Sequence, residues 1–233
     1  MTPDALETIF WYVGLGLEFV LLGLLLRNGT YRSIPFFFAY VLWGSLDDIV
    51  SLFMTSSTAS EGYLQHYVLA MTLDALFELA VWVELGRAVL RHNRAKPPQP
   101  ALALLLFALA AVLVWSMAQM SLWHSGVTLL RMLFVYLRQA HVIMMVAVLL
   151  TFVWLSGILG LRWAERELQI ATGFGIYFMV SLTVYVLHTH VDFEPLSRRL
   201  DQIEVASHLG ALLYWIISFL QFDEKPQNFL VRA

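Results

Sequence analysis

Cysteine is absent from the 233 residues of this chain. Its absence excludes disulfide bonds, thiolate metal sites and cysteine nucleophiles. Charge is also scarce, because only 13% of the residues are charged, whereas soluble domains carry roughly 25%. Hydrophobic residues make up 60% of the chain. This composition predicts an all-α, polytopic membrane protein in contact with the lipid bilayer, and it excludes the soluble basic face that a nucleic-acid partner requires.

Several signatures of cofactor binding and catalysis are missing as well. The two lysines, Lys96 and Lys225, both lie outside the apolar segments, so retinal is excluded as a cofactor because its Schiff base needs a transmembrane lysine. We predict no other cofactor. No GxSxG, HExxH or HxxxH pattern occurs, and the sequence therefore does not favour an enzyme.

Seven apolar segments are long enough to cross a membrane. A helix needs about 20 mostly apolar residues to span the ~30 Å hydrocarbon core. The segments cover residues of about 6–26, 34–54, 64–86, 101–121, 128–157, 169–190 and 200–222. They predict a single domain over residues 1–233 that consists of seven transmembrane helices. Because the N-terminus lacks a basic region and a cleavage site, we expect the first segment to be retained.

Lysine and arginine predict the orientation of these helices. With the N-terminus outside, ten basic residues fall in cytoplasmic segments, two (Arg198 and Arg199) fall outside, and two lie within the membrane. This bias predicts an outside N-terminus and a cytoplasmic C-terminus in a multi-pass protein of the plasma or inner membrane.

Ionisable residues gather in the outer halves of the predicted helices, and the inner halves are mostly apolar. Arg131, Arg138 and His141 share one helical stripe, and Asp74 and Glu78 are one turn apart. Glu204 and His208 are four residues apart on another face. The candidate ligand-binding residues are Arg138, His141, Asp74, Glu78, Asp48, Asp47, Arg131, Glu18, His208 and Glu204.

Two interpretations of these charges stand side by side. In the first, an outward-facing polar cavity takes a small polar or charged ligand, with Arg138 as its anion contact and Asp74 and Glu78 as its acceptors. In the second, Asp74 or Asp48 pairs with Arg138 and sets the register between helices. The acids outnumber the two arginines, so we expect some of them to be protonated, solvated or ligand-bound.

The first interpretation predicts a seven-helix membrane sensor or ligand-binding module that signals through a cytoplasmic or membrane protein partner. One alternative is a small-solute or proton-coupled transporter. Another is an intramembrane metal enzyme using His188, His190 and Asp192, with His208 as a possible addition, although we predict no metal site. A structural subunit of a membrane complex is a further alternative. We expect Ser45, Ser51 and Ser181 to bond carbonyls of their own helices.

Short apolar motifs carry a resemblance to a known group. They are the segment Ile34-Pro35-Phe36-Phe37-Phe38-Ala39-Tyr40 after a basic loop, an acid-bearing third segment, an arginine-bearing fifth segment and Gly173-Phe174-Gly175. In these features the chain resembles uncharacterised bacterial seven-helix integral membrane proteins. The resemblance implies the seven-helix fold and no particular activity.

Overall fold

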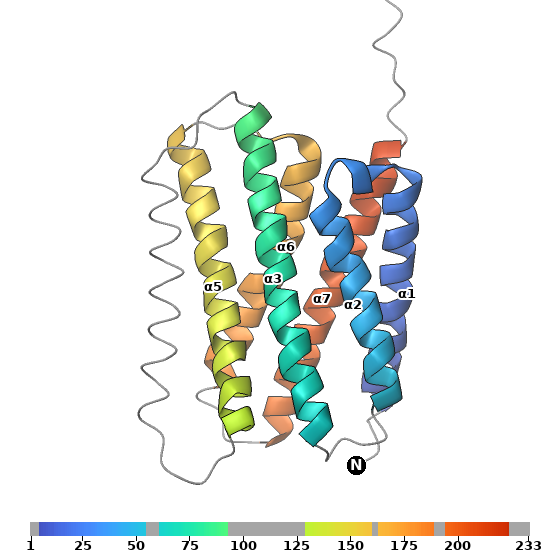
Figure 1. The fold of residues 1–233 in the computed structure, drawn as a ribbon, viewed down its shortest axis with the longest axis vertical. Coiled ribbons are helices and arrows are strands. Elements are labelled where there is room, and N and C mark those ends of the chain that lie inside the picture. The colour runs from blue at the N-terminus through green and yellow to red at the C-terminus, as the bar shows by residue number, and fades with distance from the viewer. Residues whose placement is uncertain (1–4, 55–60, 93–128, 160–162, 189–193, 224–233) are drawn as a thin grey trace, which may run out of the picture.

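The computed structural model describes residues 5–54, 61–92, 129–159, 163–188 and 194–223. Over these residues the chain is all-helical and contains no strand, which confirms the predicted all-α class (Figure 1). The helices are α1 (Ala5–Arg27), the short 3-10 helix η1 (Thr30–Arg32), α2 (Pro35–Met54), α3 (Glu61–His92), α5 (Leu129–Leu159), α6 (Glu165–His188) and α7 (Glu194–Asp223). The predicted segment 101–121 lies outside the described residues.

Two predicted segments are shorter than the helices to which they correspond. Helix α3 continues six residues beyond the predicted end at residue 86, and α7 begins six residues before residue 200. Hydropathy detects only the apolar part of a helix, whereas backbone hydrogen bonds continue into polar turns at its ends. Pro195 is compatible with the start of α7 because a helix has no partner for the N–H groups of its first turn.

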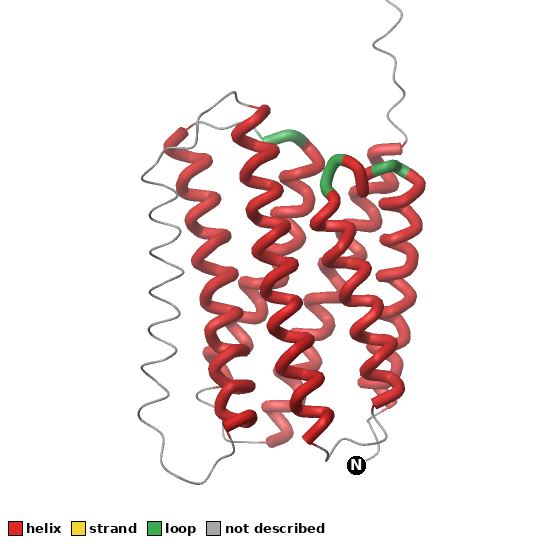
Figure 2. The backbone as a smooth tube through the Cα atoms, in the orientation of Figure 1, coloured by secondary structure: helices red, strands yellow, loops and turns green. Residues whose placement is uncertain are grey.

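The helices form a closed ring in which each contacts the next. The neighbouring pairs are α1–α2, α2–α3, α3–α5, α5–α6, α6–α7 and α7–α1, and α3 also reaches α6 across the ring. Figure 2 shows the long helices running side by side, joined by short turns where these are described. The ring creates an interior that side chains from all six long helices can face.

The outer surface of the ring is apolar. Large hydrophobic side chains such as Phe19, Leu150, Trp154 and Ile217 are exposed. Among the described residues, four stretches are long and apolar enough to cross a membrane: Thr8–Arg27, Pro35–Phe53, Glu165–His188 and Arg198–Gln221. An apolar outer surface of this extent suits lipid rather than water, and the chain is accordingly a membrane protein.

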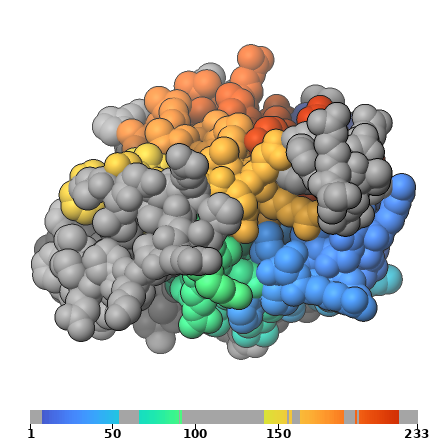
Figure 3. Space-filling model, turned by 90° about the horizontal axis from the view of Figure 1, so that it is seen from above, coloured from blue at the N-terminus to red at the C-terminus, as the bar shows by residue number. Residues whose placement is uncertain are grey.

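Aromatic side chains fill the interior at the end of the bundle where α1 leads into η1. Phe37, Phe174 and Trp215 are fully or almost fully buried, and their ring centroids lie 5.0–6.2 Å apart. The Trp215 indole N–H donates a hydrogen bond to the Ile170 carbonyl at 3.3 Å. Figure 3 looks onto this end, where blue atoms of the first part of the chain, green atoms of α3 and yellow-orange atoms of α6 lie beside one another. We call Phe37, Phe174, Trp215 and Phe219 the aromatic core.

A single carboxylate of α3 binds the first turn of helix α2. Glu84 accepts hydrogen bonds from the backbone N–H groups of Phe36 and Phe37 at 3.0 and 3.3 Å. The first N–H groups of a helix have no partner within the helix, and a side-chain oxygen that accepts from them stabilises the helix end. Glu84 therefore joins two helices by capping one of them.

Removing this cap is expected to destabilise the protein. Glu84→Leu should lower the free energy of unfolding by roughly 1–2 kcal/mol, because both N–H groups lose their acceptor. Unfolding in mixed detergent micelles, followed by tryptophan fluorescence, measures the change. Glu84→Gln keeps one carbonyl oxygen as an acceptor and should lose less stability. Equal stability of the Leu variant and the unmodified protein would contradict the capping role.

Candidate functional site

A cavity of about 640 Å³ lies inside the ring at the end where α1 begins. It is lined mainly by α2 and by the first halves of α1, α3 and α7, which run past one another at this end (Figure 1), and α5 and α6 also contribute lining residues. Its described lining contains seven carboxylates and three imidazoles: Glu18, Asp47, Asp48, Asp74, Glu78, Asp201 and Glu204, with His66, His141 and His208. The aromatic core closes the interior beyond it.

Pairs of one imidazole and one carboxylate connect neighbouring helices around the ring. Asp47 and His66 join α2 to α3 at 3.3 Å, Glu78 and His141 join α3 to α5 at 3.0 Å, His188 and Asp201 join α6 to α7 at 3.2 Å, and Glu18 and His208 join α1 to α7 at 3.8 Å. Four of the six contacts between neighbouring helices therefore contain such a pair. Each pair connects its two helices at one level along the axis of the bundle.

The pairs differ in burial. The Glu78 side chain is 4% exposed and its partner His141 is also largely buried, so this pair lies deep in the bundle. At the other extreme, the Asp201 side chain is 53% exposed and lies at the rim of the cavity. The cavity thus extends from the buried Glu78 to the surface near Asp201.

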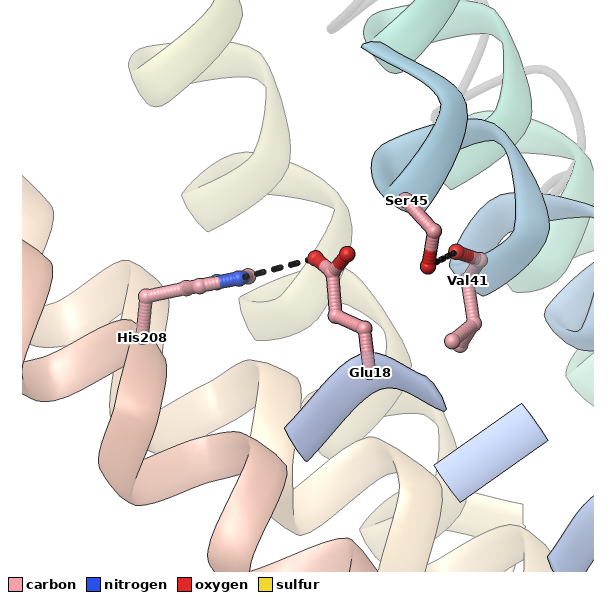
Figure 4. A network of polar contacts seen from close by, with 4 residues as sticks. All are labelled: Glu18, Val41, Ser45 and His208. Carbon is pink, nitrogen blue, oxygen red and sulfur yellow. Dashed lines mark hydrogen bonds and ion pairs between the residues drawn. The ribbon is translucent and has the colours of Figure 1, made fainter. Parts of the chain in front are cut away.

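Glu18 is, like Glu78, a buried acid of the cavity. The residue is 5% exposed, and its Oε1 atom lies 3.8 Å from His208 Nε2, a longer separation than in the other three pairs (Figure 4). Its Oε2 atom is buried and has no hydrogen-bond partner among the described residues. The Ser45 hydroxyl nearby donates to the Val41 carbonyl of its own helix at 3.1 Å instead (Figure 4). A buried oxygen without a partner is costly, so Glu18 marks a position where a further group could bind.

Gly44 lets helix α2 approach this carboxylate closely. A Cβ atom added at Gly44 would lie 3.2 Å from Glu18 Oε1. A small residue at such a position allows two membrane helices to come together. The glycine thus places the Glu18 carboxylate between α1, α2 and α7.

Aromatic rings form much of the remaining wall. Phe10, Trp11, Tyr40, Tyr67 and Tyr177 line the cavity. The Tyr177 ring lies 5.4 Å from the His208 ring at an angle of 68°. The described lining residues include no lysine or arginine. The wall therefore combines negative charge with the electron-rich faces of aromatic rings.

The structure brings together most of the residues that the sequence singled out. Eight of the ten candidates line one cavity: Glu18, Asp47, Asp48, Asp74, Glu78, His141, Glu204 and His208. The side chains of Arg131 and Arg138 lie outside the described part of the structure, so the role of Arg138 as an anion contact stays a prediction. The partner of Glu78 within the described residues is His141.

His66 and Asp201 line the cavity but were not predicted as site residues. The signal for His66 was its spacing, because His66, Ala70, Asp74 and Glu78 follow one another at intervals of four and all line the cavity. Asp201 likewise precedes Glu204 and His208 on one face of α7. Extending these stripes by one or two turns would have included both residues.

The remaining sequence expectations have mixed outcomes. His188 pairs with Asp201, whereas His190 and Asp192 lie outside the described residues. Within the described ranges, no group of three or more His, Asp or Glu side chains is arranged to hold a metal ion. Ser45 bonds its own helix as expected, but the prediction was wrong for Ser181, whose buried hydroxyl makes no hydrogen bond to a carbonyl of its own helix. Ser51 lines the cavity.

No protein-family model, curated protein or solved structure matches this chain. Its function is therefore inferred from the chemistry of the cavity. A volume of about 640 Å³ falls within the range of roughly 300–1,000 Å³ that is typical of small-molecule sites. Carboxylates attract cations and accept hydrogen bonds, and imidazoles exchange protons near neutral pH.

Proposed function

We propose that this protein is a seven-helix membrane sensor or ligand-binding module that takes a small ligand into its polar cavity. The single observation that carries the proposal is the cavity itself, about 640 Å³ in volume and lined by seven carboxylates and three imidazoles inside a ring of helices. Ionisable groups inside a membrane are costly and commonly mark a functional site. The predicted helix at residues 101–121 completes the count of seven.

The cavity opens toward the outer side of the plasma membrane in this proposal. The excess of Lys and Arg in the connecting segments that we assign to the cytoplasm supports an outside N-terminus. The cavity lies at the end where α1 begins. The ligand would therefore enter from outside, near Asp201.

The pairs between helices offer a way for a bound ligand to change the bundle. Glu18 and Glu78 both line the cavity and both pair with an imidazole on another helix. A ligand that binds one arrangement of these pairs better than another shifts the population of helix arrangements. A cytoplasmic or membrane protein partner would then receive the signal at the inner end.

The histidines support a proton-coupled transporter as a second candidate. His66, His141 and His208 each pair with an acid at the cavity, and such pairs can take up and release protons. The aromatic core fills the interior beyond the cavity, which favours binding over passage. Ligand uptake into proteoliposomes that requires Glu78 would favour the transporter.

Cysteine labelling tests the cavity and its orientation, and the natural chain offers a background without cysteine. Ser51→Cys, at the cavity wall, should react with a charged, membrane-impermeant methanethiosulfonate added from outside. Ser218→Cys is the matched control because Ser218 is buried in α7 at the end of the aromatic core, and it should not react.

Two labelling results would contradict these expectations. Reaction of Ser51→Cys only from the cytoplasmic side would reverse the orientation. Equal protection of Ser51→Cys and Ser218→Cys from both sides would contradict an accessible cavity.

A further inference from the structure

The imidazole–carboxylate pairs divide the six long helices into two units of three. The pairs between α2 and α3 and between α3 and α5 join these helices into what we call the central unit. The pairs between α6 and α7 and between α7 and α1 join the other three helices into the terminal unit. The two boundaries between the units, α1–α2 and α5–α6, contain none of the four pairs, and they are the least extensive contacts between neighbours in the ring.

The course of the chain follows the same division. The central unit comes from one stretch of the chain, residues 35–159, and the terminal unit consists of α1 and the last two helices. The chain passes from one unit to the other twice, from α1 to α2 and from α5 to α6. Both passages lie at the end opposite the cavity, which is the upper end in Figure 1 and which we call the closed end. At the cavity end, the chain joins only helices of the same unit.

The aromatic core connects the two units at the closed end. The ring of Phe37, in the central unit, lies among three rings of the terminal unit, 5.1 Å from Trp215 and 6.2 Å from both Phe174 and Phe219. The ring of Trp82 in α3 also lies 6.0 Å from that of Phe174. All of these side chains are buried. Separating them would expose apolar surface, so the core holds the units together at this end.

At the cavity end, the units face each other across the cavity. Helices of both units supply lining residues. Where α1 meets α2, the indole N–H of Trp11 donates a hydrogen bond to the carboxylate of Asp48, and Gly44 lies against Glu18. Glu18 and Asp48 carry like charges and repel each other when both are ionised. An attractive contact between the units therefore lies beside charges that oppose it.

We infer that the central and terminal units rotate relative to each other about the aromatic core, and that this rotation opens and closes the outer end of the cavity. The inference rests on the proposed function, because it supplies the motion by which the cavity admits its ligand. Each unit moves as one body, since the four pairs lie within the units. Closure of two bodies around a ligand is a common conformational change, and a ligand that contacts both units favours the closed arrangement.

Distances between spin labels test the inference on the full-length chain in lipid nanodiscs, and the natural chain has no cysteine to remove. Phe53→Cys with Leu187→Cys measures the distance between α2 and α6 at the cavity end. Phe36→Cys with Leu168→Cys measures the distance between the same two helices at the closed end. Val13→Cys with Leu187→Cys measures a distance within the terminal unit. All five side chains are exposed, so labels fit without disturbing the interior.

The distance between α2 and α6 should vary at the cavity end and stay fixed at the closed end. Pulsed EPR should give a distribution at the cavity end that is wider by about 2 Å or more than the other two, the displacement typical of larger rearrangements. Any other order of the three widths would overturn the inference. Equally narrow distributions would mean that the units do not move, and equally wide ones that the aromatic core does not hold them.

Two glycines offer variants that are crowded to a similar degree. A Cβ atom at Gly44 would lie 3.2 Å from Glu18, across the boundary between the units, and one at Gly14 would lie 3.3 Å from Leu209, within the terminal unit. Added volume in a packed contact moves its neighbours. Gly44→Val should therefore lengthen the mean distance at the cavity end by about 2 Å or more, and Gly14→Val, the matched control, should leave it unchanged. Equal shifts in the two variants would contradict the boundary.

The outcomes separate this inference from the proposed function. If Ser51→Cys reacts from outside while the three distributions are equally narrow, the accessible cavity stands and the motion of the units is overturned. An unreactive Ser51→Cys together with three narrow distributions removes both. If Gly44→Val does not fold, the three labelled pairs in the otherwise unmodified chain decide.

Discussion

Glu78→Ala is expected to lower the free energy of unfolding by about 3–5 kcal/mol, the range measured when one partner of a buried ion pair is removed. Glu78 and His141 lie 3.0 Å apart, and the Glu78 side chain is almost fully buried. Removing the carboxylate leaves the imidazole without its partner between α3 and α5. Reversible unfolding in mixed micelles, followed by tryptophan fluorescence, measures the loss.

The double variant Glu78→Leu with His141→Leu shows whether the pair or the packing is responsible. It removes both polar groups at once and should recover much of the stability, because replacing a whole buried pair by apolar residues is often neutral or stabilising. Asp201→Asn is the matched control at the rim, where the pair is half exposed and should contribute at most about 1 kcal/mol. A similar loss for Asp201→Asn and Glu78→Ala would show that burial does not determine the effect.

Gly173→Ala is expected to cost about 1–3 kcal/mol, and Gly173→Val more, because extra atoms in a packed interior force their neighbours to move. A Cβ atom at Gly173 would overlap the Trp215 indole, with Nε1, Cε2 and Cδ1 all at 3.0 Å or closer. This ring is rigid and 1% exposed. Its displacement would also break the hydrogen bond from Trp215 to the Ile170 carbonyl.

Gly210→Ala provides the comparison for this glycine. Gly210 lies in α7 like Trp215, but a Cβ atom there would meet nothing within 4 Å. Alanine is also preferred to glycine within a helix, so this variant should be neutral or slightly stabilising. Equal stability of Gly173→Ala and Gly210→Ala would contradict the close contact between α6 and α7.

The apolar segments predicted six of the described helices because each turn of a membrane helix must satisfy its own backbone and face lipid or other helices. The spacing of Asp74 and Glu78 correctly placed both on one face, and both line the cavity. The ends of α3 and α7 were missed because polar turns carry no hydropathy signal. The helix predicted at residues 101–121 and the side chain of Arg138 lie outside the described part of the structure, so these predictions stand as made.

The pairing of residues within the cavity could not be predicted from the sequence. Glu78 pairs with His141, His66 with Asp47, and the carboxylate of Glu18 lies beside His208, almost two hundred residues away in the chain. Periodicity assigns a residue to a face of its own helix. It carries no information about which helix that face meets, or at what height.

The sequence by itself determined the class of the protein, the course of its helices and the concentration of ionisable groups in one half of the bundle, since these depend on local composition and spacing. Only the tertiary structure decided that α7 closes the ring on α1, that aromatic side chains block the other half, and that Glu18 is buried with one oxygen free of hydrogen bonds among the described residues. These features depend on how helices distant in sequence pack together, as where the backbone of α2 at Gly44 closely approaches the Glu18 carboxylate.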